Sequence, residues 1–373
     1  MRLTIFVPNK ITMLTQPTLL LDKTKCIANI KRMASKAKNA GVLFRPHFKT
    51  HQSAEIGDWF RQYGVDCITV SSVKMAIYFA NHGWTDITIA FPTNIREWSS
   101  INELAAKINL NIVVESPETI IYLEKKLSNP VGVYIKTDTG YGRTGVHAED
   151  YESMQELLKQ LKNCKNLIFI GFLCHAGHTY VAQGKDEILN IMNTSRQQLL
   201  ALKTFLANDF PLIQISYGDT PSCSLSDNYE GFDEIRPGNC VFYDDMQAHI
   251  GSCKTTDIAV ALACPVVAKY PLRNELIVHG GAVHLSKESI IKDGRAYYGT
   301  AVHLNGLNWD TAKIIGRVSK LSQEHGIVNV NNEQLNSVNI GDMIAILPIH
   351  SCLTANLMKS YTTTDNQCIT MMP

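Results

Sequence analysis

Several features that define whole classes of proteins are missing from this sequence. The formal charge at pH 7 is only +1, and no run of Lys and Arg forms a basic stripe, so nucleic acid is not expected as a partner. No apolar run reaches the length of a membrane span, so no membrane partner is expected. The short apolar run near the N-terminus is interrupted by Pro8, Asn9 and Lys10, which is not the pattern of a secretory signal peptide.

The ten cysteines do not have the regular spacing of a small disulfide-stabilised domain. They are scattered over 373 residues, and no secretory signal precedes them. Scattered thiols in a large chain are typical of a reducing compartment. We therefore expect a cytoplasmic protein with reduced cysteines, one of which is a possible metal ligand.

From about residue 17, short apolar runs alternate with helical patterns. Residues 18–21 lead to Asp22, a plausible helix N-cap, and Gly41 closes the helix that follows. Eight candidate strands come next. Each gap between successive strands can hold a helix, although the last gap, residues 217–232, is mostly loop. The eight segments are 42–46, 66–70, 86–90, 111–115, 131–136, 167–173, 212–216 and 233–236.

These strands are continuous apolar runs, which is typical of parallel strands buried on both faces. Eight β/α units between residues 17 and 250 predict an α/β fold, a (β/α)8 TIM-type barrel. The alternative, an open doubly wound sheet, is disfavoured because no Gly-x-Gly-x-x-Gly follows the first strand.

The pattern changes after residue 250, where helical periodicity fades. The apolar and β-branched runs there are 257–268, 275–279, 314–319, 326–330 and 342–347. Turn-like pairs at 305–306 and 331–332 lie between them. We expect a mostly β C-terminal domain over residues 251–373, together with residues 1–16, of which 3–7 could form an additional strand.

Active sites of such barrels lie at the carboxyl ends of the strands. Polar and titratable residues follow nearly every predicted strand. Among them are His47, Lys49, His51, Ser71, Asn94, Lys136, Asp138, Arg143, His175, His178, Tyr180, Tyr217, Thr220, Asn239 and Tyr243. Their convergence on one face predicts an active site there.

Lys49 closes the first strand between two histidines. A lysine amine that is desolvated beside other cationic groups becomes a nucleophile toward carbonyls. The loop 216–222 follows the seventh strand, where barrels often bind a phosphate. Taken singly, these features also fit a surface lysine and an ordinary Gly/Pro turn. Together they suggest pyridoxal phosphate, with its aldehyde on Lys49 and its phosphate on the loop.

A second candidate site lies near the C-terminus. His350 and Cys352 follow an apolar strand and are two residues apart, so on an extended chain both side chains point to one face. Imidazole and thiolate form a ligand pair of the zinc type and leave coordination positions open. The alternative is a packed histidine beside a buried thiol.

Six motifs together resemble the fold-type III pyridoxal-phosphate enzymes of the D-threonine aldolase and D-serine dehydratase family. They are RPHFKTH (45–51), KTDTGYGRTG (136–145), CHAGHTY (174–180), SYGDTPS (216–222), EIRPGNCVFYD (234–244) and PIHSC (348–352). They span nearly the whole chain in the family's order. The resemblance implies an alanine racemase-like barrel, a C-terminal β domain, and a homodimer with its sites near the interface.

The resemblance also implies residue roles. Lys49 matches the lysine that forms a Schiff base with the cofactor. His350 and Cys352 match the pair that holds a divalent metal, and the resemblance implies that this metal is zinc. Further residues match the cofactor site: Arg143, Tyr180, Tyr217, Gly218, Thr220, Gly238 and Asn239. At positions 279 and 288, where the family pattern has aspartate, this chain has His279 and Glu288.

The implied activity is that of a lyase acting on a small β-hydroxy-D-amino acid. Because the family's dehydratases have His-x-Cys and its aldolases His-x-Asp, Cys352 favours D-serine dehydratase, which forms pyruvate and ammonia. The alternative is retro-aldol cleavage to glycine and an aldehyde, with His175 or His51 as the base. More distant alternatives are an amino-acid racemase, for which the second domain lacks the expected tyrosine motif, and a non-catalytic carrier of pyridoxal phosphate.

Overall fold

The computed structural model describes residues 14–373, so the strand expected at residues 3–7 lies outside the described part. The chain forms two compact units. The barrel unit contains Lys25–Asp257 and Met371–Pro373, and the β unit contains the described residues up to Thr24 together with Ile258–Thr370. In the described residues, every helix is too short or too polar to cross a membrane.

Parallel strands form the sheet of the barrel unit, in the order β2-β10-β9-β8-β6-β5-β4-β3. The strands are β2 (Leu43–Phe44), β3 (Ile68–Val70), β4 (Asp86–Pro92), β5 (Asn109–Val114), β6 (Val131–Asp138), β8 (Leu167–Cys174), β9 (Gln214–Tyr217) and β10 (Glu234–Ile235). A parallel bridge between His47 and Thr69 joins the segment after β2 to β3 and closes the ring. All eight strands predicted from the sequence are present, and the predicted barrel is confirmed.

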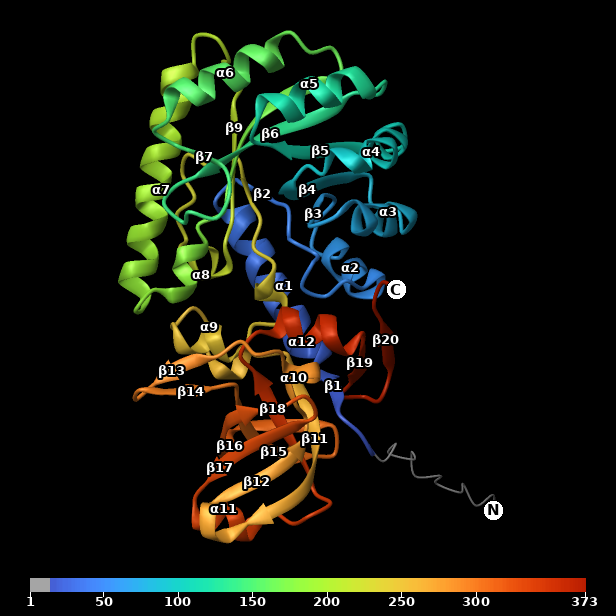
Figure 1. Cartoon of the computed structure of the whole chain (residues 1–373), viewed down its shortest axis with the longest axis vertical. Coiled ribbons are helices and arrows are strands. Elements are labelled where there is room, and N and C mark those ends of the chain that lie inside the picture. Colours follow the sequence, from blue (N-terminus) through green and yellow to red (C-terminus); the bar gives the residue numbers. More distant parts are fainter. Residues whose placement is uncertain (1–13) are drawn as a thin grey trace, which may run out of the picture. The chain divides into compact units, whose positions relative to one another are not determined.

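Helices follow the strands and cover the outside of the sheet (Figure 1). They are α1 (Lys23–Asn39), α2 (Ala54–Arg61), α3 (Val73–Asn81), α4 (Trp98–Ala105), α5 (Pro117–Lys126), α6 (Tyr151–Lys162), α7 (Lys185–Leu206), α8 (Thr220–Leu225) and α9 (Asp245–His249). Several helices begin at a polar N-cap residue. The side chains of Ser72 and Ser116, for example, each accept the backbone N–H of the residue three positions later. The sequence missed α8, which is only six residues long, and the short strand β7 (Val146–His147), which pairs with β6.

The two faces of the barrel strands differ in character. On β3, Ile68 and Val70 are fully buried, while Thr69 between them donates its hydroxyl to the carbonyl of Arg45. Alternate residues of a strand point to opposite faces, so the apolar side chains pack under the helices and the polar ones share the other face. A polar network therefore fills part of the barrel, and its members reappear beneath the candidate active site.

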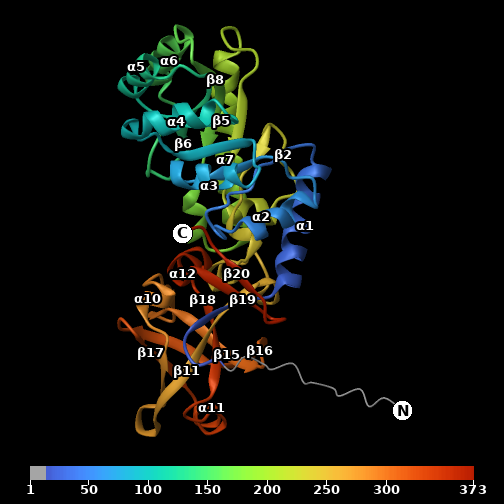
Figure 2. The same ribbon diagram turned by 90° about the vertical axis from the view of Figure 1, so that its right-hand side faces the viewer.

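The β unit contains a second sheet (Figure 2). Its elements are β1 (Thr18–Leu21), β11 (Val260–Tyr270), β12 (Glu275–His279), α10 (Ala282–Leu285), β13 (Ile290–Lys292), β14 (Arg295–Tyr297), β15 (Gly299–Asn305), β16 (Asn308–Leu321), β17 (His325–Val330), α11 (Asn332–Ser337), β18 (Met343–Pro348), α12 (Ser351–Met358), β19 (Ser360–Thr363) and β20 (Cys368–Thr370). Because β12 pairs with both β17 and β11, strands β12-β17-β16-β15-β18-β11 form a closed ring. Closure leaves this ring without a free edge.

Strand β1 belongs to the β unit, although the sequence analysis placed residues from 17 onward in the barrel. It pairs antiparallel with β11 and parallel with β19. The register that joins Leu19 to Leu262 is a long-range pairing, which hydrophobic periodicity cannot reveal. The predicted runs of the β domain each correspond to a strand, and the Asn305–Gly306 turn joins β15 to β16 as expected.

Candidate active site

The loops after the barrel strands bring basic side chains together at one end of the barrel unit. Burial lowers the pKa of His47 well below its usual value, and the neighbouring Lys49, Arg236, His175 and Arg143 act in the same direction. These groups come from segments that follow β2, β6, β8 and β10, and they lie close enough for their charges to interact. The structure therefore places three predicted residues, Lys49, Arg143 and His175, in one basic cluster, together with His47 and Arg236.

Lys49 lies in the turn after β2, where its side chain is exposed. The ring of Phe48 is fully buried, with its centroid 5.0 Å from those of Phe60, Phe79 and Trp84. Lys49 itself is exposed, and its backbone N–H donates to Nδ1 of His47. The aromatic core under Phe48 thus fixes the turn and leaves the lysine side chain accessible to a ligand.

His51 does not share this position. Its ring is fully buried and packs against Phe48, Phe60 and Phe79, with centroid distances of 4.4, 5.7 and 6.0 Å. Its Nδ1 accepts the backbone N–H of Ser53, and burial lowers the pKa of the ring to about 3. The enclosure of the ring favours a packing role for His51, and its assignment as a base stays a prediction.

His175, the other histidine considered as a base, is only half-buried. Its Nδ1 lies 2.7 Å from the carbonyl oxygen of Gly218, which can only accept a hydrogen bond. The ring proton is therefore on Nδ1, and Nε2 carries the lone pair. Burial, followed by the charges of Lys49 and Arg143, lowers the pKa of His175 well below its usual value, so the ring is neutral and available as an acceptor.

The loop after β9 contains a buried hydroxyl that no neighbour satisfies. Oγ1 of Thr220 is inaccessible and has no hydrogen-bond partner among the described residues. The backbone N–H of Thr220 donates to the hydroxyl of Tyr180, whose ring lies 6.3 Å from that of His175. Buried hydroxyls are normally hydrogen-bonded. An unpaired donor beside a basic cluster fits the oxygen of a bound phosphate.

Glycines allow the loops after β9 and β10 to approach their neighbours. A Cβ at Gly218 would lie 2.9 Å from Cβ of Arg236, and one at Gly238 would lie 2.6 Å from the carbonyl oxygen of His47. No side chain can be added at either position without moving the segment that leads to Lys49 or the segment that follows β10. Gly238 therefore holds the last barrel loop directly against the segment that carries Lys49.

Two predicted cofactor residues have their side chains occupied within the protein. The ring of Tyr217 is fully buried and stacked on Phe232 at 4.5 Å, and its hydroxyl donates to Ser222. The side-chain amide of Asn239 donates to Asp244 at 2.7 Å. Both residues shape their loops by packing and hydrogen bonding.

We predict opposite effects of Thr220→Val on stability and on cofactor binding. Valine removes an unpaired buried hydroxyl, so the cofactor-free protein should be as stable as the wild type or slightly more stable. Affinity for pyridoxal phosphate should fall about 10- to 150-fold, because one hydrogen bond to a charged acceptor is worth about 1.5–3 kcal/mol. Thermal unfolding and fluorescence titration measure the two effects.

The matched control is Thr179→Val. The hydroxyl of Thr179 is already paired with Ala176 and with Asp219 at 2.9 and 3.0 Å, so this variant should lose about 1–2 kcal/mol of stability. If T220V destabilised the cofactor-free protein as much as T179V, the hydroxyl of Thr220 would have an internal partner and no role in phosphate binding.

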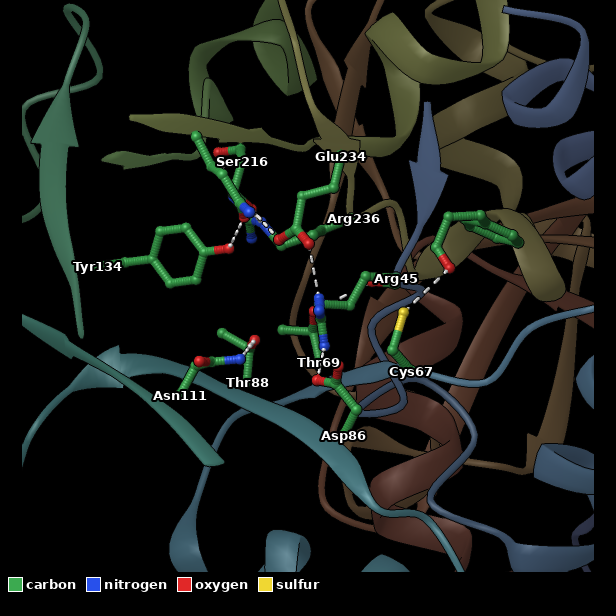
Figure 3. A network of polar contacts seen from close by, with 12 residues as sticks. Arg45, Cys67, Thr69, Asp86, Thr88, Asn111, Tyr134, Ser216, Glu234 and Arg236 are labelled. Atoms are coloured by element: carbon green, nitrogen blue, oxygen red, sulfur yellow. Dashed lines mark hydrogen bonds and ion pairs between the residues drawn. The ribbon is translucent and has the colours of Figure 1, made fainter. Parts of the chain in front are cut away.

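Arg236 is a site residue that the sequence analysis did not single out. It is buried, its Nε lies 2.5 Å from Oγ of Ser216, and its Nη2 donates to the carbonyl of Cys174. Ser216 in turn donates to Glu234, which pairs with Arg45, so that the guanidinium is connected to charges deeper in the barrel (Figure 3). The arginine stands within the quoted motif EIRPGN, but nothing in the motif distinguishes a site arginine from a packed one.

Tyr141 was also missed. The carboxylate of Asp138 accepts the backbone N–H groups of Gly140, Tyr141 and Gly142, with distances from 2.9 to 3.1 Å to its nearer oxygens. The ring of Tyr141 lies against Gly177, where a Cβ would come within 2.4 Å of the ring. The carboxylate therefore organises the loop that presents Tyr141 and Arg143 toward His175, whose ring centroid is 5.8 Å from that of Tyr141.

The candidate metal pair belongs to the β unit. Strand β18 ends at Pro348, His350 is the N-cap of α12, and Cys352 lies in the first turn of that helix. The extended geometry expected for His-x-Cys is therefore wrong, since the chain turns into a helix between the two residues. Both side chains are half-buried, and an imidazole with a thiol is a donor set that suits zinc.

Comparison with known proteins identifies relatives over the whole chain. Residues 21–245 match the family model described as alanine racemase, N-terminal domain, and residues 259–364 match a serine dehydratase domain. The chain is 29% identical over 383 residues to D-serine dehydratase of Dictyostelium discoideum, with 95% of both chains covered. It is 26% identical to D-threo-3-hydroxyaspartate dehydratase of Delftia sp. strain HT23, with 93% of both chains covered.

The solved structure of the Delftia enzyme superimposes with a TM-score of 0.88 at 25% identity, covering 97% of this chain and 98% of that one. Solved forms of that enzyme include a histidine-to-alanine mutant and a cysteine-to-alanine mutant in the metal-free form. The arrangement of a parallel barrel and a mostly β unit is thus shared with known structures.

Proposed function

Because this chain belongs to the family of the alanine racemase N-terminal domain, we propose that it is a pyridoxal-phosphate-dependent lyase that removes water from a β-hydroxy-D-amino acid. The substrate that we propose is D-serine, with pyruvate and ammonia as the products. Relatives named D-serine dehydratase support this substrate, since three of them cover 93–95% of the chain.

One observation carries the proposal. The basic cluster around Lys49 lies beside the buried, unpartnered hydroxyl of Thr220. Lys49 and Arg143 would hold the anionic cofactor, with Thr220 and the backbone around Gly218 and Gly238 at its phosphate. When bound, pyridoxal phosphate supplies an electron sink that stabilises negative charge at Cα of an amino acid.

Lys49 has two tasks in this proposal. Its amine holds the cofactor and, once a substrate amine has replaced it, accepts the proton from Cα. Its exposed position on a rigid turn, anchored by buried Phe48, suits both tasks. His175 keeps its proton on Nδ1, toward Gly218, and so offers Nε2 as an acceptor for a substrate hydroxyl or ammonium group.

His350 and Cys352 would hold a divalent metal, which we propose to be zinc. A half-buried imidazole and thiol, with two positions left open, suit this ion. When bound, the metal supplies Lewis acidity toward the β-hydroxyl of the substrate. The thiol is also what favours elimination over the aldolase alternative, for which the resemblance implies a carboxylate at position 352.

Product analysis tests the function. Purified protein, loaded with pyridoxal phosphate and zinc, is incubated separately with D-serine, L-serine, D-threonine and 3-hydroxy-D-aspartate. We expect pyruvate and ammonia in equal amounts from D-serine and no product from L-serine. Glycine together with an aldehyde would refute the dehydratase and support the retro-aldol alternative, while turnover of 3-hydroxy-D-aspartate alone would change the substrate but not the reaction class.

We predict that removing the metal lowers kcat for D-serine about 10²-fold or more, since Lewis-acid stabilisation is worth several kcal/mol. Chelation and Cys352→Ala should give the same loss. Cys368→Ser changes an exposed cysteine outside the metal pair and should leave the rate unchanged. A C352A enzyme with wild-type activity and metal content would remove Cys352 from the site.

We also propose a homodimer in the cytoplasm. The ten cysteines all lie within the described residues and form no disulfide there, which supports a reducing compartment. The family resemblance supports the dimer. Light scattering of the purified protein measures the assembly, and a monomer at micromolar concentration would contradict it.

A further inference from the structure

Three metal-ligating side chains meet in the β unit, apart in sequence from His350 and Cys352. They are His279 at the end of β12, His284 on α10, and Glu324 in the turn between β16 and β17. One ligand atom from each lies within 4.8 Å of the other two. Oε2 of Glu324 is 3.4 Å from Nε2 of His279 and 3.8 Å from Nε2 of His284.

These distances suit coordination of a common ion. In a tetrahedral zinc site with bonds of about 2.0–2.1 Å, neighbouring ligand atoms are roughly 3.3 Å apart. The distance from Glu324 to His279 already matches that spacing, and the distance from Glu324 to His284 is slightly longer. Two imidazoles and one carboxylate are a donor set of intermediate softness, which suits zinc and other divalent transition metals better than calcium or magnesium.

The backbone holds these ligands in place. Gly280, Ala282 and Val283 donate their N–H groups to the carbonyls of the turn 322–324, at 2.8 to 3.2 Å. The close approach depends on Gly281, since a Cβ there would lie 2.3 Å from the carbonyl oxygen of Gln323. Ligands on such a fixed frame are pre-organised for binding.

Solvent can reach the centre of the cluster. The side chain of His279 is 41% exposed and that of Glu324 is 49% exposed, whereas that of His284 is 15% exposed. Metal can therefore enter directly, and water can take the fourth position.

From this geometry we propose that His279, His284 and Glu324 form a second site for a divalent transition metal, with zinc as the best fit. The ion links the end of β12, the helix α10 and the β16–β17 turn. Because α10 packs against α12, the ion would also brace the helix whose first turn carries Cys352. The proposal of this metal site does not depend on the proposed lyase reaction.

Binding has a specific consequence for His284. Its Nδ1 lies 3.2 Å from the backbone nitrogen of Gly281 and accepts that N–H, so the neutral ring carries its proton on Nε2. Coordination through Nε2 moves that proton to Nδ1, and the contact with Gly281 is lost. The ring nitrogens of His284 should therefore exchange roles on binding, which their ¹⁵N chemical shifts report.

The test uses the full-length variant H350A/C352A, so that only the second site remains. Zinc is the probe, with bound metal measured by equilibrium dialysis and stability by thermal unfolding. We expect about one equivalent of zinc per chain and a higher Tm with zinc. Adding H279A or E324Q should weaken binding at least about tenfold and remove the Tm shift. Adding Glu333→Gln, an exposed carboxylate of the same unit, should change neither.

Two outcomes would overturn the proposal. The first is the absence of bound zinc in H350A/C352A. The second is bound zinc that H279A and E324Q leave in place. Since His279 and Glu324 are on the surface, their variants should fold, and the dialysis result is decisive either way.

Discussion

Lys49→Ala will abolish turnover of D-serine, lowering kcat by about 10⁴-fold or more. Loss of a positioned base alone costs about 10²–10⁴-fold, and the variant also loses its covalent hold on the cofactor. Because Lys49 is exposed, its removal should change the free energy of unfolding by less than about 0.5 kcal/mol. Steady-state kinetics and thermal unfolding measure the two quantities.

Two further variants separate charge from chemistry. Lys49→Arg keeps the positive charge of the basic cluster but provides no nucleophilic amine, so it should be as inactive as K49A. Lys38→Ala removes an exposed lysine on α1 and should retain wild-type kinetics. Activity of K49R within tenfold of the wild type would show that Lys49 acts only as a charge.

Glu234→Gln will destabilise the barrel by about 3 kcal/mol. The carboxylate of Glu234 is 1% exposed, accepts Nε of Arg45 at 2.7 Å and accepts Oγ of Ser216 at 2.5 Å. Glutamine leaves the guanidinium of Arg45 buried with Asp86 as its remaining carboxylate partner, and breaking a buried ion pair costs about 3–5 kcal/mol. Denaturant unfolding measures the loss.

The control is Glu230→Gln, an exposed carboxylate nearby in sequence, which should change stability by less than about 0.5 kcal/mol. The double variant R45M/E234M should be more stable than E234Q, since it removes both desolvated charges of this pair together. An E234Q protein within 1 kcal/mol of the wild type would show that the pair contributes little. The same variant should also weaken cofactor binding, because Ser216 connects Glu234 to Arg236.

The barrel could be predicted because its outer layer follows simple periodicity. Residues such as Ile68, Val70, Ile87 and Ile89 form apolar runs at the spacing of β/α units. The opposite face of the strands was not predictable in the same way. Arg45 and Glu234 are adjacent only because β2 and β10 pair, although the residues are 189 apart in sequence.

Contacts between residues distant in sequence also decide which of the predicted site residues are exposed. Lys49 and His51 are two positions apart in one motif, yet one side chain is exposed and the other is enclosed by Phe48, Phe60 and Phe79. The chain turns at 48–51 and is no longer a regular strand, so side chains two residues apart there do not share one face. At His350, the start of α12 interrupts an extended pattern in the same way.

The central claim is that Lys49 is the residue that carries the cofactor. Borohydride reduction of the protein loaded with pyridoxal phosphate, followed by digestion and mass spectrometry, tests it most directly. The claim predicts one pyridoxyl group per chain, on the peptide that contains Lys49, and none on the peptides that contain Lys136 or Lys74. Label on another lysine, or an unlabelled Lys49 peptide in protein that has bound cofactor, would contradict it.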